Sequence, residues 1–332
     1  MRIPGAKTAR IFSRWLQARA LGGALILGYH RVARPALDLY GVYVSPEHFA
    51  EHLAALRKWA NPIRLSTLVK HLKEGSLPPR SVAVTFDDGY ADNLYHAKPL
   101  LDVYEIPATI FVSTGYAGKE FWWDELNRLV MTSQADPREL RLEAPNIHFP
   151  RKRSLQGTGA EHPKQSSTRS HFTQELYNLL LPLDVDDLDI AMDAIRTWSG
   201  RSPSGEADSR AMSMDELLTL AGHELIEIGS HTRNHLFLPG LTPERQRQEI
   251  AAGKQDLETL LGRPIDGFSY PNGRSTEETR QIVRDAGFGY ACTSLHNVVR
   301  SGADLYDLTR FWQQDVDGDK FISGLNLWMK TR

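Results

Sequence analysis

The sequence predicts an α/β fold in which parallel strands form a barrel that carries a mostly helical insertion. Short apolar runs that end in turn residues alternate with segments of helical periodicity, as in successive βα units. The 332 residues are enough for one large barrel. Hydrophobic residues make up 41% and charged residues 24% of the chain, so we expect a buried core rather than wholesale disorder.

The first part of the barrel is predicted from three apolar runs and the helical segments between them. The segment after Ser45 places Phe49, Leu53 and Leu56 on one helical face, and Ser45 is a suitable N-cap. In order, we expect a strand at Ala24–Leu27, a helix at Pro46–Trp59, a helix at Ser66–Leu72 capped by Ser66, a strand at Ser81–Phe86, a helix at Ala97–Tyr104 and a strand at Ala108–Val112.

The alternation stops at about residues 118–213, which we interpret as a mostly helical insertion. Helices are expected at Trp122–Met131, Phe172–Leu181 and Leu188–Trp198. Residues 150–170 are polar, basic and rich in Ser, Gly and His, so we expect an exposed loop there.

The alternation then resumes and completes a single barrel domain over residues 23–325. Ser213 and Thr242 are suitable N-caps for the first two helices of this part. In order, we expect a helix at Met214–Ala221, a strand at Glu224–Ile228, a helix at Pro243–Leu261, a strand at Gly267–Ser269, a helix at Glu277–Ala286, a strand at Tyr290–Thr293 and a final apolar segment at Leu308–Trp312.

Residues 1–22 are interpreted as a basic amphipathic leader. Basic and apolar residues alternate there at helical spacing, so residues 1–20 could make peripheral contact with a membrane or with another protein; a loosely packed leader helix is the alternative. We do not expect a signal peptide, because the apolar stretch Leu21–Leu27 is short and lacks a small-residue cleavage site. The expected location is therefore cytoplasmic, with or without membrane association.

Charge and cysteine content restrict the classes of partner and of metal site. The formal net charge is -2, which argues against nucleic-acid binding, because phosphate contacts need an excess of basic residues. Cys292 is the only cysteine, so a metal ion would have to be held by His, Asp or Glu.

An acidic pair directly follows the predicted strand Ser81–Phe86. In α/β barrels the residues at the carboxyl ends of the strands line the active site, so clusters that are distant in sequence meet at one end. At the break between strand and loop, Asp87 and Asp88 could both reach one site, one toward a metal and the other toward a water. Gly89 permits the sharp turn that follows. An ordinary Asp-Asp-Gly turn is the alternative.

Two histidines follow a later strand. His231 and His235 are four residues apart, so one helical turn would place both imidazoles on the same side, as in helical zinc sites. With one carboxylate of the acidic pair they form a 2-His-1-carboxylate set, which leaves coordination positions open for water and substrate. A pair of exposed histidines is the alternative, but the combination with the acidic pair favours a metal site.

Two further clusters follow strands. Phe268–Gly273 is a strand end broken by Pro and Gly, which by itself is typical of a plain turn. His30 follows the first strand and would face the same end of the barrel, where an imidazole could act as a general acid. A structural histidine is the alternative.

Together these segments resemble the polysaccharide deacetylase family, which is also called carbohydrate esterase family 4 or the NodB-homology domain. Thr85–Gly89 matches its first motif, His231–His235 matches its second, and Phe268–Gly273 resembles its third. The resemblance implies a distorted (β/α) barrel of the NodB type. It also implies that Asp88 and the two histidines bind Zn²⁺, or another divalent ion such as Co²⁺ or Ni²⁺, and that Asp87 is the catalytic base.

The chain departs from the family pattern at several positions. Ser269 occupies the place of the usual Arg that orients the base, and Asn272 replaces a usual Tyr, although its backbone N–H could still bind an oxyanion. The usual C-terminal Leu-x-His motif is not evident. Related biofilm deacetylases have an early Tyr-His motif instead, which Tyr29-His30 resembles, so His30 is the expected acid. Contacts with substrate or oxyanion are expected from Pro271, Asn272, Tyr29 and Trp123.

The resemblance implies a hydrolase that removes N-acetyl groups from an amino-sugar glycan, such as a polysaccharide or a glycolipid. Trp122, Trp123 and Trp312 could stack on sugar faces, or could be packing residues. One alternative is a related hydrolase of a non-sugar or formyl amide, which would use the same metal ligands. The other is a non-catalytic glycan-binding barrel.

Overall fold

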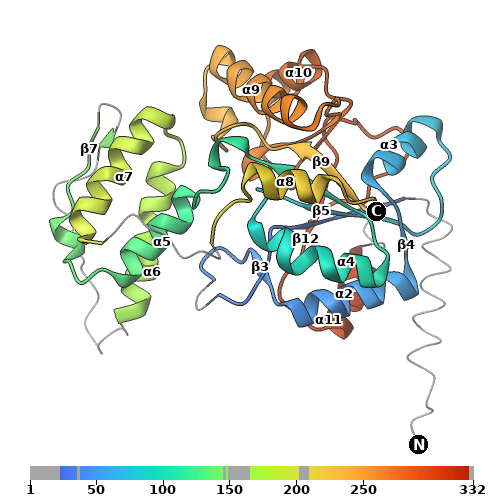
Figure 1. Cartoon of the computed structure of the whole chain (residues 1–332), viewed down its shortest axis with the longest axis horizontal. Helices are drawn as coiled ribbons and strands as arrows, with labels where there is room; N and C mark the ends of the chain where they lie inside the picture. The colour runs from blue at the N-terminus through green and yellow to red at the C-terminus, as the bar shows by residue number, and fades with distance from the viewer. Residues whose placement is uncertain (1–22, 36–37, 145–146, 149–164, 202–208, 329–332) are drawn as a thin grey trace, which may run out of the picture.

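The computed structural model describes residues 23–35, 38–144, 147–148, 165–201 and 209–328 (Figure 1). Within these residues, eight parallel strands form one sheet in the order β11-β10-β9-β6-β5-β1-β12, with β4 paired to β5. The strands are β1 Leu25–Tyr29, β4 Asn61–Pro62, β5 Ser81–Phe86, β6 Ala108–Val112, β9 Ile226–Ser230, β10 Gly267–Ser269, β11 Tyr290–Cys292 and β12 Phe311–Trp312.

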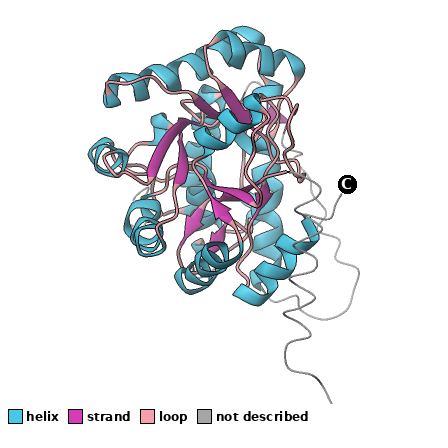
Figure 2. Ribbon diagram, turned by 90° about the vertical axis from the view of Figure 1, so that its right-hand side faces the viewer, coloured by secondary structure: helices cyan, strands magenta, loops and turns pink. Residues whose placement is uncertain are grey.

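The two ends of this sheet approach each other, so the sheet curls into the predicted distorted barrel. Leu308 forms a parallel bridge with Cys292 at the end of β11, and Phe311 pairs with Leu27 of β1 a few residues later. From β5 to β11 the successive strands of this sheet are neighbours, and each connection between them contains at least one helix. Figure 2 shows the strands in the centre with helices around them. The predicted fold class is therefore confirmed.

Apart from α11, the helices around the sheet agree with the predicted ones except near their ends. They are α2 Pro46–Trp59, α3 Leu65–Glu74, α4 Lys98–Tyr104, α8 Met214–Ala221, α9 Pro243–Leu261, α10 Glu277–Asp285 and α11 Gly318–Trp328. The side chains of Ser45, Ser213 and Thr242 cap α2, α8 and α9 as predicted. The predicted cap Ser66 is wrong, because α3 already begins at Leu65 and the Ser66 hydroxyl donates to the Glu227 carboxylate.

Helix α11 and the π-helical turn Asn93–Ala97 before α4 were not predicted. Among the described residues, no helix is both long enough and apolar enough to span a bilayer.

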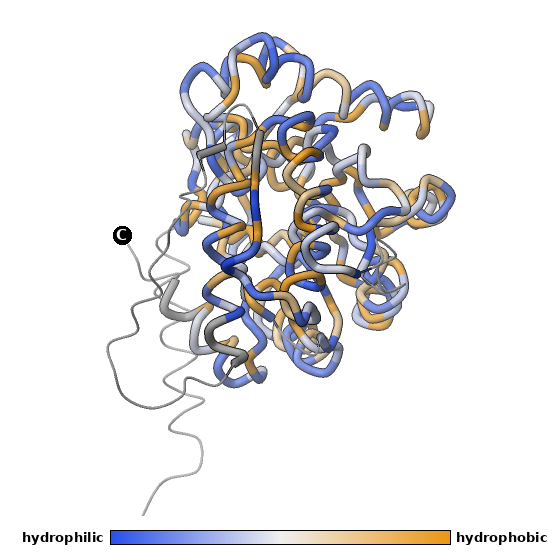
Figure 3. Tube along the Cα trace, turned by 90° about the vertical axis from the view of Figure 1, so that its left-hand side faces the viewer, coloured by the Kyte–Doolittle hydropathy of each residue, from blue (hydrophilic) through white to orange (hydrophobic). Residues whose placement is uncertain are grey.

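Strand alternation sorts the side chains into two cores. Leu25 and Leu27 of β1 belong to the core between the sheet and the outer helices, together with Leu53 of α2. Ile26, between them, belongs to a second core with Phe111 of β6 and with one face of α3. Hydrophobic and hydrophilic residues correspondingly alternate along the outer helices (Figure 3).

Small residues in the barrel interior make space for large ones. A Cβ atom on Gly28 would lie 2.7 Å from the Trp312 ring, and one on Gly229 would lie 2.4 Å from the Phe111 ring. Since contacts this short are sterically forbidden, these two glycines determine how far the aromatic side chains enter the barrel.

The insertion forms a helical subdomain beside the barrel, with a hydrophobic core of its own (Figure 1). It contains α5 Trp122–Thr132, α6 Gln165–Leu180 and α7 Val185–Ser199, together with a short antiparallel pair, β7 Glu143–Ala144 and β8 Ile147–His148. Helix α6 begins earlier than predicted, so the end of the expected loop 150–170 is helical. Residues 149–164 of that loop and the predicted leader 1–22 lie outside the described residues.

Candidate active site

The acidic pair lies at the carboxyl end of β5, as predicted. Asp87 follows Ala83 and Thr85 in the strand alternation, so its side chain enters the barrel. Asp88 has a φ of 72°, and Gly89 has a φ of 81°. This left-handed turn brings the second carboxylate to the same side as the first, and both carboxylates are buried.

The two histidines follow β9, but the predicted helical turn between them is wrong. The segment is a loop in which Thr232 and His235 have φ values of 65° and 53°, and the Thr232 hydroxyl accepts a hydrogen bond from the backbone N–H of His235 at 3.0 Å. A Cβ atom on Gly253 of α9 would lie 2.5 Å from the Thr232 backbone, so only glycine allows this helix to support the loop. The fold nevertheless places the His231 and His235 rings 4.8 Å apart.

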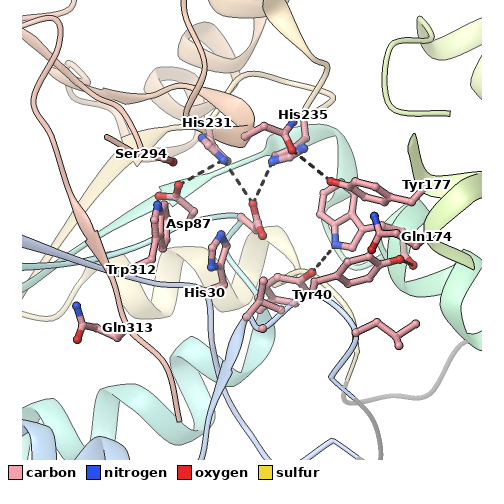
Figure 4. A pocket seen from close by; sticks show the side chains of 18 residues that line it. His30, Tyr40, Asp87, Gln174, Tyr177, His231, His235, Ser294, Trp312 and Gln313 are labelled. Atoms are coloured by element: carbon pink, nitrogen blue, oxygen red, sulfur yellow. Dashed lines mark hydrogen bonds and ion pairs between the residues drawn. The ribbon is translucent and has the colours of Figure 1, made fainter. Parts of the chain in front are cut away.

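Asp88 and the two histidines converge on one point (Figure 4). The Oδ1 atom of Asp88 lies 3.4 Å from Nε2 of His231 and 3.3 Å from Nε2 of His235. This oxygen is buried and has no hydrogen-bond partner among the described residues. A donor set of two imidazole nitrogens and one carboxylate oxygen fits a divalent cation.

The surroundings of His231 also fit a metal ligand. Its Nδ1 lies 2.7 Å from the backbone oxygen of Ser269, and because a carbonyl can only accept, Nδ1 carries the hydrogen. The lone pair of a neutral ring is then on Nε2, which faces Asp88. Burial lowers the pKa of His231, but Asp87 and Asp88 outweigh burial and raise it. Positive charge is thus favoured at the position that a cation would take.

Asp87 is held by Arg310, which the sequence analysis missed. The Arg310 guanidinium donates to Oδ1 and Oδ2 of Asp87 at 2.7 and 2.8 Å, and to the Ser269 hydroxyl at 2.8 Å. The Ser269 hydroxyl itself donates to Asp87 at 3.0 Å. Burial raises the pKa of Asp87, but the charge and hydrogen bonds of Arg310 outweigh burial and hold it below its ordinary value. Arg310 therefore takes the place of the arginine that the third motif lacks.

The sequence did contain a signal for Arg310. It is a lone arginine inside the apolar segment 308–312, and it is fully buried in the structure. A buried arginine needs an acidic partner, so this residue could have been paired with one of the barrel carboxylates.

A cavity of about 460 Å³ opens over Asp87 and the three converging side chains. The barrel lines one side, where the His30 ring stacks on Trp312 with centroids 4.3 Å apart. The insertion lines the other side through Trp123 of α5 and Tyr177 of α6 (Figure 4). Residues 39–42, between β2 Arg31–Val32 and β3 Tyr43–Val44, complete the wall. Burial lowers the pKa of His30, although Asp88 and Asp87 oppose this effect.

Two of the predicted substrate contacts line this cavity. The Trp123 ring lies 4.5 Å from His235, and its indole N–H donates to the Tyr90 hydroxyl at 2.8 Å. Asn272 has a φ of 57° and accepts a hydrogen bond from the Tyr177 hydroxyl at 3.3 Å. This bond connects the insertion to the third motif. Their roles toward a substrate stay predictions.

The two other predicted contacts do not line the cavity. Pro271 is buried and does not line the cavity. Tyr29 points into the outer core, where it contacts Phe49 and its hydroxyl lies 3.2 Å from Nδ1 of His52. The assignment of Tyr29 is wrong because neighbouring strand residues face opposite sides, so His30 and Tyr29 cannot both face the cavity.

Comparison with protein families agrees with this geometry. The polysaccharide deacetylase family matches residues 74–134 and 191–291, which contain the acidic pair and both histidines. The chain belongs to this family. Polysaccharide deacetylases are hydrolases of carbon–nitrogen bonds in N-acetylated glycans, so the predicted enzyme class is confirmed. The two matched segments flank most of the helical insertion.

Individual relatives of this polysaccharide deacetylase differ in how much they share with it. YxkH of Bacillus subtilis (strain 168), itself assigned to the polysaccharide deacetylases, is 24% identical over 306 residues, which are 90% of this chain and 74% of that protein. The poly-beta-1,6-N-acetyl-D-glucosamine N-deacetylase of Staphylococcus aureus (strain N315) is 30% identical over 130 residues, which are 35% of this chain and 43% of that protein.

Solved structures support the fold. The deacetylase PplD of Streptococcus pyogenes, solved in complex with acetate, has a TM-score of 0.59 at 17% identity and covers 93% of this chain and 99% of its own. IcaB from Ammonifex degensii also has a TM-score of 0.59, at 21% identity, and covers 93% of this chain and 98% of its own.

Proposed function

We propose that this chain is a metal-dependent N-deacetylase of an amino-sugar glycan, and that Asp87 is its base. The observation that carries the proposal is that two carboxylates in one buried site have different partners. Oδ1 of Asp88 faces two imidazole nitrogens and has no hydrogen-bond partner, whereas Asp87 is held by Arg310. One carboxylate can thus serve as a ligand while the other stays ionised as a base.

The proposed ligands are Asp88, His231 and His235, and the expected ion is Zn²⁺, with Co²⁺ or Ni²⁺ as alternatives. When bound, such an ion supplies Lewis acidity that polarises the acetyl carbonyl and lowers the pKa of water. Three protein ligands are the number that catalytic zinc sites use, because the remaining position stays open.

In the proposed reaction Asp87 accepts the proton of the attacking water. Its Oδ2 atom lies 3.7 Å from Nε2 of His231, so the base lies beside the proposed ligand set without belonging to it. The low pKa that Arg310 imposes keeps Asp87 ionised. As the water oxygen bonds to the acetyl carbon, its proton passes to Asp87, and the backbone N–H of Asn272 is the proposed donor to the carbonyl oxygen.

Collapse of the tetrahedral adduct breaks the C–N bond, and the nitrogen must receive a proton to leave as an amine. His30 is the proposed donor, because it lies in the cavity wall within electrostatic range of Asp87 and Asp88. Its lowered pKa makes the imidazolium a stronger acid and also a less abundant one at neutral pH. The products are acetate and a free amino sugar.

The substrate that we propose is a glycan of N-acetylglucosamine. The staphylococcal relative, whose name gives poly-beta-1,6-N-acetyl-D-glucosamine as its substrate, supports this choice. Trp123, Tyr177 and Trp312 line the cavity with aromatic surface that could stack on sugar rings. A formyl or other non-sugar amide is the alternative substrate, since the same ligand set would serve it.

An assay of released products tests this proposal. The purified, Zn²⁺-loaded protein is incubated with poly-N-acetylglucosamine and with chitooligosaccharides, and acetate, formate and ammonia are measured. We expect acetate and a matching number of new free amines, and loss of both after treatment with a chelator. Release of formate or ammonia from small amides, without acetate release from the glycans, would favour the alternative. No release from any substrate by the metal-loaded protein would support a glycan-binding role.

A further inference from the structure

A second cavity of about 540 Å³ lies behind the wall of the active site. Asp124 and Asn127 of α5 line it on one side, and Arg31 and Tyr43 of the β2–β3 segment line it on the other. Its volume is in the range of small-molecule sites. Tyr90 separates the two cavities, because it lines the first and donates a hydrogen bond from its hydroxyl to Oδ2 of Asp124, which lines the second, at 2.7 Å.

The arginines around this cavity are already paired with acidic side chains. Arg31 binds Asp92 at 2.7 Å. Arg128 binds Glu120 at 2.8 Å. Arg34 forms an ion pair with Glu47. These pairs account for the positive charge that could otherwise have attracted an anionic ligand.

Asp124 has no such ion pair. Its side chain is only 8% exposed, and in the part of the chain that the structure describes no Lys, Arg or His lies within ion-pair distance of it. Burial raises the pKa of Asp124 to about 7, although the charge of Arg31 and the Tyr90 hydroxyl oppose this effect. A buried carboxylate without a counter-ion is costly, and a cationic ligand would relieve the cost.

Asn127 adds a second unsatisfied acceptor to the same cavity. It lies three residues after Asp124 in α5, so the two side chains project from one face of the helix. Its Oδ1 atom is buried and has no hydrogen-bond partner among the described residues. A ligand that fills this cavity would therefore bring a hydrogen-bond donor, such as a hydroxyl or an amine.

We infer that the second cavity binds an amino sugar with a free amine, whose ammonium group pairs with Asp124 and whose hydroxyl groups donate to Asn127. The choice of ligand rests on the proposed function, because a free amino sugar is the product that this function generates. An N-acetylated sugar offers no positive charge to Asp124, so the cavity distinguishes deacetylated from acetylated units.

A hydrogen-bonded chain connects this cavity to the active site. Asp124 accepts from the Tyr90 hydroxyl, which in turn accepts from the indole N–H of Trp123 at 2.8 Å. The Trp123 ring lies 4.5 Å from His235. A deacetylated unit bound at Asp124 would thus lie against the wall of Tyr90 and Trp123 that also borders the catalytic pocket. This arrangement suits recognition of glycans that are already partly deacetylated.

Binding without turnover tests this inference. Calorimetric titrations of the protein with D-glucosamine, N-acetylglucosamine and glucose are carried out at pH 7, for the native chain and for Asp124→Asn, Asn127→Ala and Asp186→Asn. Asparagine keeps the size of Asp124 and an acceptor for Tyr90 but removes the charge. Asp186 is an exposed acid of α7, so its substitution is a matched control for the change of charge.

We expect D-glucosamine to bind the native chain, and Asp124→Asn to weaken this affinity by about 10- to 100-fold, as for loss of a charged hydrogen bond. Asn127→Ala should weaken it by about threefold to tenfold, and Asp186→Asn should leave it unchanged. Equal affinity of the native chain and of both cavity variants would place any bound amine elsewhere and overturn the inference. Asn127→Ala keeps the Asp124–Tyr90 bond and so remains informative if Asp124→Asn does not fold.

The result is independent of the deacetylase assay. If the native chain binds glucosamine but releases no acetate from any glycan, the proposed function alone is contradicted. Deacetylation of glycans by a chain that does not bind glucosamine through Asp124 would contradict the second site alone.

Discussion

The barrel and the helical insertion contribute to the same cavity in different ways. From the barrel come charged side chains that several bonds hold in place; Asp87, for example, is held by Arg310 and Ser269. From the insertion come aromatic side chains with few polar contacts; Tyr177 reaches the barrel through one hydrogen bond of 3.3 Å to Asn272. From this difference we propose that the barrel determines the reaction, whereas the insertion shapes the space in which the substrate lies.

The physical basis of this division is the stiffness of the two regions. The ends of parallel strands are held by the sheet on both sides, so they can keep charged atoms within tenths of an ångström. A segment inserted between two strands is not held by the sheet in this way, and it tolerates changes in its length and sequence. Substitutions in the barrel should therefore affect kcat, and substitutions in the insertion should affect KM.

The largest effect is expected for Asp87→Asn. Asparagine fits the same space and can still contact Arg310, but it cannot accept the proton of water, so kcat should fall by about 10³-fold. Metal content, measured by inductively coupled plasma mass spectrometry, should stay at the native level because Asp87 is outside the proposed ligand set. An active variant would remove Asp87 from the role of base.

Removal of a proposed ligand should act on the metal itself. His235→Ala should weaken Zn²⁺ binding by more than the roughly 10- to 100-fold that loss of an outer-shell partner costs. Competition with a fluorescent chelator measures this affinity. His223→Ala, which changes a histidine outside the site on the segment before β9, is the matched control. Unchanged zinc affinity in His235→Ala would contradict the proposed ligand set.

Arg310→Lys tests how the barrel holds Asp87, the proposed base. Lysine keeps one positive charge but cannot form the two parallel hydrogen bonds to Asp87, so we expect kcat to fall by about 10- to 100-fold with little change in KM. Arg310 lowers the pKa of Asp87, and its weakening should raise that pKa. Since only the ionised carboxylate is a base, the acidic limb of kcat/KM should move to higher pH. A profile with an unmoved acidic limb would show that Arg310 has only a structural role.

The smallest effect is expected in the insertion. Tyr177→Phe removes the hydrogen bond to Asn272 and keeps the ring, which stacks on Trp122 with centroids 5.2 Å apart. A loss of about 1 kcal/mol corresponds to a roughly fivefold higher KM for the glycan at constant kcat. Steady-state kinetics with an oligosaccharide series measures both constants. A drop in kcat of the size expected for Arg310→Lys would break the division between barrel and insertion.

The correct and the wrong predictions have a common physical origin. The motif residues Asp88, His231 and His235 could be found because they directly follow apolar strands, and the ends of parallel strands converge. The helix predicted between the histidines was wrong because two left-handed residues, which spacing alone does not reveal, fold that segment as a loop. The spacing correctly predicted that the two imidazoles converge, but a loop and not a helical turn brings them together.

Arg310 and Tyr29 show where local patterns fail. Which face of a strand enters the barrel depends on register, and a shift of one residue exchanges the two faces. The Tyr-His pair therefore could not show which of its two members lines the cavity. Arg310 could be recognised as unusual in an apolar segment, but its partner lies more than 200 positions away in the chain, at a distance of 2.7 Å.

The sequence by itself determined the order of the longer strands and helices that precede α11, the acidic pair, the two histidines and the position of the insertion, because these depend on local periodicity and on which residues follow a strand. Only the tertiary structure decided which carboxylate pairs with Arg310, which side chains face the cavity, and that α5 lines a second cavity behind Tyr90. Those features depend on contacts between segments far apart in the chain, and such contacts exist only once the sheet has closed around its core.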